Sequence, residues 1–204
     1  MRASGSVVPI TIAVILSCER FAFAAQNDIA SRRGTQMLGA QEIISRLGLA
    51  PHPREGGWFV ETYRSREVLS QANLPSRYAG PRSFGTAIYY LLTPETRSAL
   101  HRLRSDEVFH FYLGDAVVML NLHPNGTSAV MRLGRDIGAG EKLQHVVPRD
   151  VWQGAYLAQE SRFALLGCTV APGFDYADYE PGARTDLLRR YPDRGAMIIR
   201  LTEP

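Results

Sequence analysis

Short apolar runs, separated by turn residues, dominate the chain after residue 57. The runs are rich in β-branched and aromatic side chains, and several alternate apolar with polar residues, which is typical of β-strands. Many short strands with turns at steady spacing predict an all-β sandwich or barrel. The expected strands are residues 58–63, 86–93, 98–103, 107–113, 116–122, 128–133, 142–147, 151–157, 163–170 and 196–201.

Two segments show helical spacing instead. Residues 40–47 carry their isoleucines and leucine on one helical face, and Gly48 then supplies a C-terminal stop. Residues 183–190 predict a second short helix with Leu187 and Leu188 directed inward. The pattern therefore predicts a β-rich domain with short helices near its N-terminal and C-terminal ends.

Two connections between these elements have distinct characters. Gly114-Asp115 separates two strand-like runs and predicts a two-residue hairpin turn. Residues 65–82 are polar, contain prolines and glycine, and are long for a structureless connection. We interpret them as a loop at the rim of a site.

The N-terminus carries the three parts of a secretory signal peptide. Arg2 supplies a positive start, residues 7–17 are an apolar run, and Ala22-Phe23-Ala24 is a small-x-small cleavage pattern. The apolar run is too short to span a membrane, which takes about 20 residues. We expect an exported, periplasmic protein. The resulting division is a signal peptide at 1–25, a flexible leader at 26–39 and a single domain at 40–204.

Two alternatives to this N-terminus stay open. Translation from Met37 would leave the protein in the cytoplasm, and lipidation of Cys18 would anchor it to a membrane surface. The mature domain retains Cys168 as its one cysteine, so it forms no intrachain disulfide. Cys168 lies in an apolar run and is interpreted as a buried core thiol.

Composition excludes some partners. The 204 residues carry a formal charge of +3, and the basic residues are scattered with no run longer than two. A basic stripe that follows phosphates is therefore not indicated, and we expect no nucleic-acid partner.

The stretch 100–114 concentrates the candidate chemistry. Side chains alternate between the two faces of a strand, so His101 lies on the face of Leu103, and Glu107 on the face of Phe109 and Phe111. If both faces point inward, a histidine and a carboxylate meet in an otherwise apolar pocket.

The spacing of His101, Glu107 and Gly114 resembles the first motif of the cupin superfamily, with Leu103 at the position of the second histidine. Residues 140–153 resemble the second motif. There, Asp150 stands at the usual glycine and Gln153 at the usual histidine. The blocks 51–65 and 168–180 are similar to the cupin type 5 branch, which has no settled biochemical function. The resemblance implies a double-stranded β-helix, the jelly-roll cupin barrel.

The resemblance also implies a metal site. His101, Glu107 and Gln153 occupy family ligand positions, and imidazole and carboxylate suit iron, manganese, nickel or zinc. Leu103 contributes no ligand and glutamine is a weak one, so the cofactor is either none or one divalent metal ion. The alternative is that His101 and Glu107 form a buried, charge-assisted hydrogen bond.

The same pair suits acid–base catalysis without metal. Burial raises the pKa of a carboxyl group and a neighbouring imidazolium lowers it, so either group can titrate near neutrality. Some cupins that epimerise sugars use a histidine and a tyrosine. We therefore assign catalytic roles to His101, Glu107 and Tyr89, with Tyr90, Tyr112 and Tyr176 as further candidates for the tyrosine.

Other residues are expected to bind the ligand or to shape its site. Arg64 suits capture of carboxylate or phosphate, or a rim salt bridge to Glu61. Asp175, with Asp178 and Glu180, suits sugar hydroxyls, although closing a loop by turn hydrogen bonds is the favoured role. His52 and His123 are interpreted as loop surface residues. The expected ligand-binding set is Arg64, Gln153, Phe109, Phe111, Trp152 and Asp175.

Three functions fit this pattern. The first is an enzyme that isomerises or epimerises a sugar or sugar nucleotide without metal. The second is a non-catalytic ligand-binding or structural cupin dimer, and the third a metal-dependent oxygenase. Residues 89–92 and 117–120 would expose apolar groups on the outer face of their strands, which predicts a homodimer.

Overall fold

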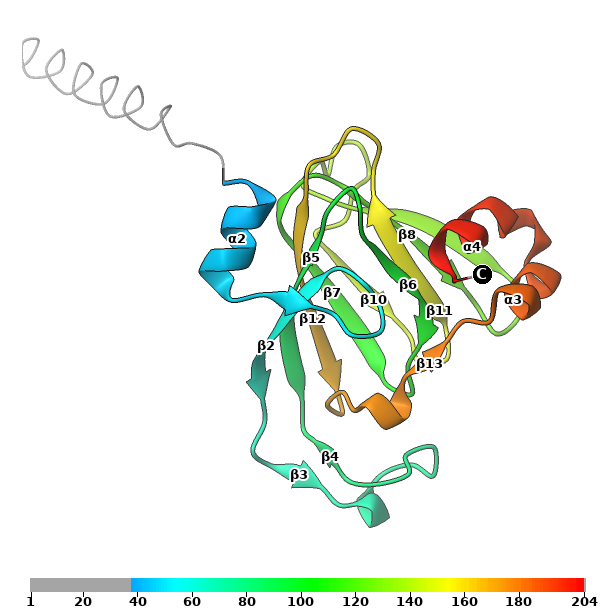
Figure 1. The fold of residues 1–204 in the computed structure, drawn as a ribbon. Coiled ribbons are helices and arrows are strands. Elements are labelled where there is room, and N and C mark those ends of the chain that lie inside the picture. The colour runs from blue at the N-terminus through cyan, green and yellow to red at the C-terminus, as the bar shows by residue number, and fades with distance from the viewer. Residues whose placement is uncertain (1–37, 204) are drawn as a thin grey trace, which may run out of the picture. The chain divides into compact units, whose positions relative to one another are not determined.

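The computed structural model describes residues 38–203, and these residues form two β-sheets that face each other (Figure 1). One sheet has six strands in the order β1-β2-β5-β12-β7-β10, and the other has five in the order β13-β6-β11-β8-β9. A separate pair, β3-β4, lies in the predicted rim loop. The fold is the jelly roll that the sequence predicted. The strands are β1 (Ala50–Pro51), β2 (Trp58–Arg64), β3 (Val68–Leu69), β4 (Arg82–Ser83), β5 (Thr86–Leu92), β6 (Arg97–Arg102), β7 (Asp106–Gly114), β8 (Val117–Leu122), β9 (Ser128–Leu133), β10 (Gln144–Val147), β11 (Trp152–Leu157), β12 (Ala164–Ala171) and β13 (Glu180–Pro181).

Strand alternation builds the core between the two sheets. Phe109 and Leu166 project from the six-stranded sheet and meet Met119 and Leu157 from the five-stranded sheet in one buried cluster. Side chains at the intervening positions point outward. The interior is therefore apolar, except where polar side chains take the inward positions of the strands.

Helices cover part of the outward apolar surface of each sheet. The helix α2 (Ala40–Leu47) packs Ile43 and Ile44 against Leu91 and Leu165 of the six-stranded sheet. Gly48 ends this helix in the left-handed conformation, as the sequence predicted. These contacts cover the face of residues 89–92 within one chain.

The other sheet is covered near the C-terminus. The helices α3 (Arg184–Arg190) and α4 (Gly195–Leu201) lie beside the five-stranded sheet (Figure 1) and pack Leu187, Ile198 and Leu201 into a cluster with Leu120 and Leu122. The apolar faces on which the homodimer prediction rested are thus packed against helices of the same chain, so they do not call for a partner.

The prediction of a last strand over residues 196–201 was wrong, because this segment forms α4. Ile198 and Leu201 lie three residues apart and are both buried against the sheet, which is helical spacing. A short apolar run fits either element, and packing against Leu120 selects the helix.

The hairpin predicted at Gly114-Asp115 was also wrong. The strand β7 pairs with β10 and β12, whereas β8 pairs with β9 and β11, so the two residues connect the two sheets. Gly114 has φ of 101°, and the Asp115 amide donates to the Phe163 carbonyl at 2.8 Å. The glycine therefore makes the sharp change of direction that a strand crossing between sheets requires.

The rim loop, residues 65–82, is fixed to the barrel at its end. Arg82 and Asp178 form a bidentate salt bridge with N–O distances of 2.6 and 2.7 Å, and both side chains are 4% exposed. Asp178 lies in the 3₁₀ helix η2 (Tyr176–Asp178), and a second such helix, η1 (Gln71–Asn73), lies within the loop. A third, η3 (Pro192–Arg194), connects α3 to α4.

None of the helices within residues 38–203 has the length and apolar composition needed to cross a membrane. The expected signal peptide at 1–25 and all but the end of the expected leader at 26–39 lie outside the described residues.

Candidate functional site

Three polar side chains converge in the interior, as strand alternation predicted. His101 on β6, Glu107 on β7 and Gln153 on β11 are all buried. The Gln153 amide nitrogen lies 2.5 Å from Glu107 Oε2 and 3.3 Å from His101 Nε2. The prediction that these three residues meet inside the jelly roll is confirmed by these distances.

The hydrogen bonds indicate which nitrogen of His101 carries a proton and which groups of the triad donate. His101 Nδ1 lies 2.8 Å from the Ala99 carbonyl oxygen, so this nitrogen carries the proton and Nε2 is an acceptor in the neutral ring. The Gln153 NH2 group then donates one hydrogen to His101 and the other to Glu107. Its carbonyl oxygen is buried without a partner among the described residues. The amide therefore couples the histidine to the carboxylate.

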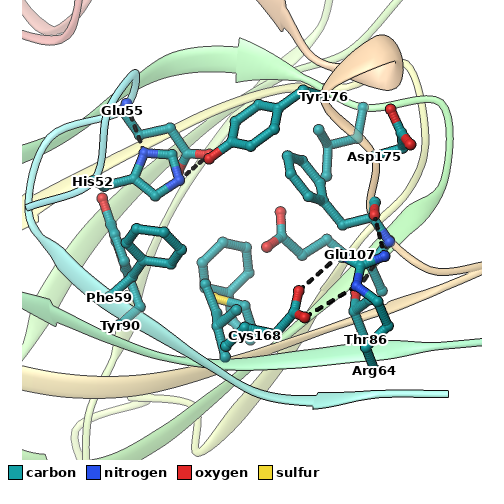
Figure 2. A pocket seen from close by; sticks show the side chains of 16 residues that line it. His52, Glu55, Phe59, Arg64, Thr86, Tyr90, Glu107, Cys168, Asp175 and Tyr176 are labelled. Carbon is teal, nitrogen blue, oxygen red and sulfur yellow. Dashed lines mark hydrogen bonds and ion pairs between the residues drawn. The ribbon is translucent and has the colours of Figure 1, made fainter. Parts of the chain in front are cut away.

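A pocket of about 320 Å³ opens next to the triad, lined by β2, β5, β7 and β12 of the six-stranded sheet and by the loops that cover them (Figure 2). Glu107 and Phe109 line it, whereas His101 and Gln153 lie behind Glu107 and are not part of the lining. The polar lining includes Glu55, Glu61, Arg64, Thr86 and Asp175, and the apolar lining includes Phe59, Ile88, Leu103, Val170 and Phe174. A small ligand with several polar groups and an apolar face suits such a lining.

Burial controls the charge of the buried groups. Loss of solvation raises the pKa of Glu107 to about 7, with a further rise from nearby Glu55, against the lowering effects of His101 and the Gln153 hydrogen bond. Burial likewise raises the pKa of Glu55 and lowers the pKa of His101. At neutral pH, Glu107 is thus poised to hold or release a proton, and His101 is neutral.

The structure corrects the interpretation of His52. The sequence placed it on the loop surface, but it is 9% exposed and lines the pocket. Its Nδ1 accepts from the Glu55 amide at 2.9 Å, and its Nε2 lies 3.6 Å from Glu55 Oε1. The loop turns back onto the sandwich at Gly56, where a Cβ would lie 2.6 Å from the Arg97 carbonyl oxygen. This close approach brings the loop over the pocket.

Glu55 is the main residue that sequence reasoning missed. Its Oε1 lies 3.8 Å from His101 Nε2, and its Oε2 is 3.5 Å from Ser98 Oγ. The paired glycines that follow it were the available signal, because they indicate a close backbone approach rather than an exposed loop.

Some expected aromatic residues lie away from the pocket. Tyr89 is on the outer face of β5, where it packs in the cluster under α2, and Tyr90 takes the inward position. Trp152 lies on the outer face of β11 in the cluster under α3 and α4, beneath the guanidinium of Arg102. Phe111 is part of the core rather than of the lining. Strand alternation places Tyr89 and Trp152 on the wrong face for the roles that the sequence assigned.

Of the other expected ligand residues, Arg64, Phe109 and Asp175 line the pocket, whereas Gln153 does not. Arg64 is held by two hydrogen bonds to Glu61, at 2.7 and 3.0 Å, and by one to the Phe174 carbonyl at 3.1 Å. Asp175 accepts from the Ala177 amide at 2.8 Å and so closes η2 while lining the pocket. The salt bridge of Arg64 to Glu61 and the loop-closing hydrogen bond of Asp175 are thus both present at the pocket.

Two further histidines, His110 and His145, lie outside the triad. His110 is on the outer face of β7, opposite to Glu107 and Phe109, and its Nε2 is 3.2 Å from Thr169 Oγ1. His145 Nε2 is 2.9 Å from Asn121 Oδ1. Neither residue supplements His101 as a ligand for a metal.

The residues present do not fit the metal site that the family motif implies. Within residues 38–203, no group of three or more His, Cys, Asp or Glu side chains is arranged to hold a metal ion. Leu103 packs with Val170 and Tyr179 where the motif supplies a histidine. Gln153 directs its amide N–H groups toward His101 and Glu107, so the two strong ligands are already engaged with a donor.

The jelly roll with a polar triad at its motif positions defines a cupin. The chain belongs to the cupin superfamily, in the family described as Cupin superfamily (DUF985), whose model matches residues 41–181. It is 30% identical to the uncharacterized protein YML079W of Saccharomyces cerevisiae over 147 residues, which are 68% of this chain and 73% of the yeast protein.

Two solved structures share the fold over most of the chain. Protein SO0799 from Shewanella oneidensis is 34% identical, with a TM-score of 0.72, and the match covers 82% of this chain and 99% of that one. A hypothetical protein from Leishmania major is 31% identical, with a TM-score of 0.73, and the match covers 82% of this chain and 100% of that one.

Proposed function

We propose that the pocket binds a small polyhydroxylated ligand and that Glu107 transfers a proton to or from it without a metal, as in an isomerisation or epimerisation. The observation that carries this proposal is Glu107 itself, a buried carboxyl group on the pocket wall with its pKa raised to about 7. General acids and bases work best when their pKa is near the operating pH.

The lining supports the choice of ligand class. Carboxylates of Glu55 and Asp175 accept hydrogen bonds from hydroxyl groups, and the Arg64 guanidinium donates them. Phe59 and Phe174 give the pocket apolar walls for the C–H face of a sugar ring. His101 and Gln153 support Glu107 from behind, where they do not compete for the ligand.

Tyr90 is a poor replacement for Tyr89 as a second proton donor. Its hydroxyl donates to the Gly56 carbonyl at 2.7 Å, and burial raises its pKa well above the usual range. The catalytic role proposed here therefore rests on Glu107, with His101 as a positioning residue.

Hydrogen exchange with solvent tests the proposed chemistry. In D2O, the wild-type protein is expected to incorporate deuterium at a carbon next to a carbonyl in one member of a panel of aldoses, ketoses and their phosphates, as followed by mass spectrometry. Glu107→Gln should slow incorporation about a hundredfold or more, whereas Glu42→Gln, an exposed change on α2, should leave it unchanged.

The outcomes separate the proposed functions. Incorporation that is equally fast in Glu107→Gln would overturn the role of Glu107. Ligand retained in native mass spectrometry of both proteins, without any exchange, would establish the second function, a non-catalytic ligand-binding cupin.

We also propose that two chains associate. Tyr112 and Leu113 on β7, and Val146 on β10, expose 50%, 40% and 48% of their surface on neighbouring strands. A self-complementary apolar patch closes with two copies. Sedimentation at micromolar concentration should give twice the mass of the mature chain, and Val146→Glu should reduce it to a monomer. A monomeric wild-type protein would contradict this proposal.

We propose in addition that the chain is exported, on the basis of the signal pattern in residues 1–25. N-terminal sequencing of the protein from its native host should begin near Ala25 or Gln26. A cytoplasmic protein that begins at Met37 would contradict export, and a lipid on Cys18 would replace periplasmic release by anchoring.

A further inference from the structure

A second hollow of about 310 Å³ lies beside the pocket, and its lining is polar. Three arginines line it: Arg77 from the rim loop, and Arg102 and Arg104 from the end of β6 and the turn that follows. We call it the arginine hollow. Nothing in the proposed chemistry of Glu107 uses it.

Two of these arginines are held in place by each other. Arg77 Nε donates to the Arg104 carbonyl at 2.9 Å, and Arg104 Nη1 donates to the Arg77 carbonyl at 2.5 Å. The neighbouring Tyr78 is 1% exposed, and its hydroxyl lies 2.9 Å from Ser105 Oγ, which fastens the rim loop to the turn between β6 and β7. Two like charges are thus fixed side by side by backbone contacts.

Among the described residues, none of the carboxylates around the hollow is paired with Arg77 or Arg104. Asp178 is paired with Arg82, and Glu180 is paired with Arg102 at 2.8 and 2.9 Å. The Asp150 side chain is more than half exposed, and its Oδ2 lies 4.0 Å from Arg149 Nε. Within residues 38–203, neither Arg77 nor Arg104 forms a salt bridge.

Each guanidinium therefore has unused donors. A guanidinium carries five N–H groups. Arg77 uses its donors on the Arg104 carbonyl and, at 3.4 Å, on the Tyr78 hydroxyl, and Arg104 uses its Nη1 on a carbonyl. In the described part of the chain, the other N–H groups of both arginines have no protein acceptor. A planar fork of this kind matches the oxygens of phosphate.

A thin wall separates the hollow from the pocket. Leu103 lines both cavities, and it packs with Phe174 and Val170 on the pocket side and with Tyr179 on the hollow side. The segment 174–180 likewise contributes its first residues to the pocket and its later ones to the hollow. A ligand that extends past Leu103 would occupy both the pocket and the arginine hollow.

We propose that the arginine hollow is an anion subsite in which Arg77 and Arg104 bind a phosphate or diphosphate group, and that this group belongs to the ligand of the pocket. The second half of this inference rests on the proposed function and makes the ligand a phosphorylated polyhydroxyl compound. The first half stands on the two arginines alone.

Calorimetric titration with inorganic phosphate and pyrophosphate tests the subsite. Wild-type protein should bind pyrophosphate, and Arg104→Gln should weaken binding about tenfold or more, the loss of one charge-assisted contact. Arg66→Gln is the matched control, because Arg66 is exposed on the same rim loop and does not line the hollow. Arg104→Lys, which keeps the charge, should restore part of the affinity if the fold is intact. Equal binding by wild type and Arg104→Gln, or no binding at millimolar pyrophosphate, would overturn the subsite.

A second arm identifies the source of the anion. If the phosphate belongs to a pocket ligand, glucose 1-phosphate should bind at least tenfold more tightly than inorganic phosphate, and Glu107→Gln should remove that gain. Equal affinities for the two would show that the free anion is the ligand and would overturn the link to the pocket, while the anion subsite would stand. Loss of deuterium exchange, by contrast, would bear on the proposed function without touching the subsite.

Discussion

The side-chain amide of Gln153 donates to Glu107 at 2.5 Å and faces His101 at 3.3 Å. The family motif places a histidine where this glutamine stands. A neutral amide cannot neutralise a carboxylate, but it donates to one, so the glutamine stabilises the ionised form of Glu107 without adding charge. With glutamine in place of histidine, the motif's ligand position becomes a hydrogen-bond donor to Glu107.

Gln153→Leu should raise the pKa of Glu107 further. The amide is one of two hydrogen-bond donors that lower this pKa, the other being the Cys168 thiol, and leucine removes the amide while keeping most of the volume. The pH profile of deuterium exchange should move to higher pH relative to wild type. Gln144→Leu, at an exposed position on the outer face of β10, is the control and should leave the profile in place. A profile that is unchanged in Gln153→Leu would show that the amide does not tune Glu107.

Glu107 should make stability depend on pH in a defined direction. Its pKa is about 7 in the folded chain and near the ordinary value of 4.5 when unfolded, so the folded chain binds more protons between these values. The contribution of this carboxyl to stability therefore falls as pH rises through that window. Glu107→Gln does not ionise, so its stability relative to wild type should increase by about 1–3 kcal/mol from pH 5 to pH 8.

Urea denaturation at the two pH values measures this difference. The free energy of unfolding of Glu42→Gln relative to wild type should be nearly the same at both, because Glu42 is exposed in its pair with Arg46. A difference between Glu107→Gln and wild type that does not change with pH would contradict the raised pKa.

Restoring the two lost histidines should create a metal site. Leu103→His and Gln153→His together would complete the ligand set of the family motif with His101 and Glu107. The double variant is expected to retain close to one divalent metal ion per chain after dialysis, measured by elemental analysis, and wild type much less. Equal metal content in both proteins would show that the site does not depend on these positions.

The buried salt bridge between Arg82 and Asp178 should contribute strongly to the stability of the folded chain, because it anchors the rim loop. Removing one partner leaves a buried charge unpaired, so Arg82→Ala should lower the free energy of unfolding by about 3–5 kcal/mol. Arg189→Ala breaks the exposed pair with Asp186 and should cost no more than about 1 kcal/mol. Chemical denaturation compares the two, and equal losses would contradict the account of the loop anchor.

Local patterns predicted the triad and most of the strands. The positions of His101, Glu107 and Gln153 follow from strand alternation and motif spacing, both of which are local properties of the sequence. His52 and Glu55 were missed because they come from a loop that reaches the pocket only through the fold, where Gly56 meets Arg97.

Where sequence prediction failed, tertiary contacts decided the structure. The face of Tyr89 depends on the register between β5 and its neighbours β2 and β12, and α2 then covers it. The segment 196–201 is helical because Ile198 and Leu201 together fill the outer face of a sheet. A hairpin was predicted at Gly114-Asp115 because strands that are consecutive in the sequence often pair. In this jelly roll, the consecutive strands β7 and β8 belong to different sheets.

The titration of Glu107 tests the central claim most directly. In protein labelled with ¹³C at glutamate side-chain carboxyls, NMR titration should show one carboxyl with a midpoint near pH 7, in agreement with the pKa of about 7 for Glu107. That resonance should be absent from Glu107→Gln and present in Glu42→Gln. If instead every glutamate in the wild-type protein titrates below about pH 5, the range of unperturbed carboxyls, Glu107 holds no proton at neutral pH and the proposed acid–base function is contradicted.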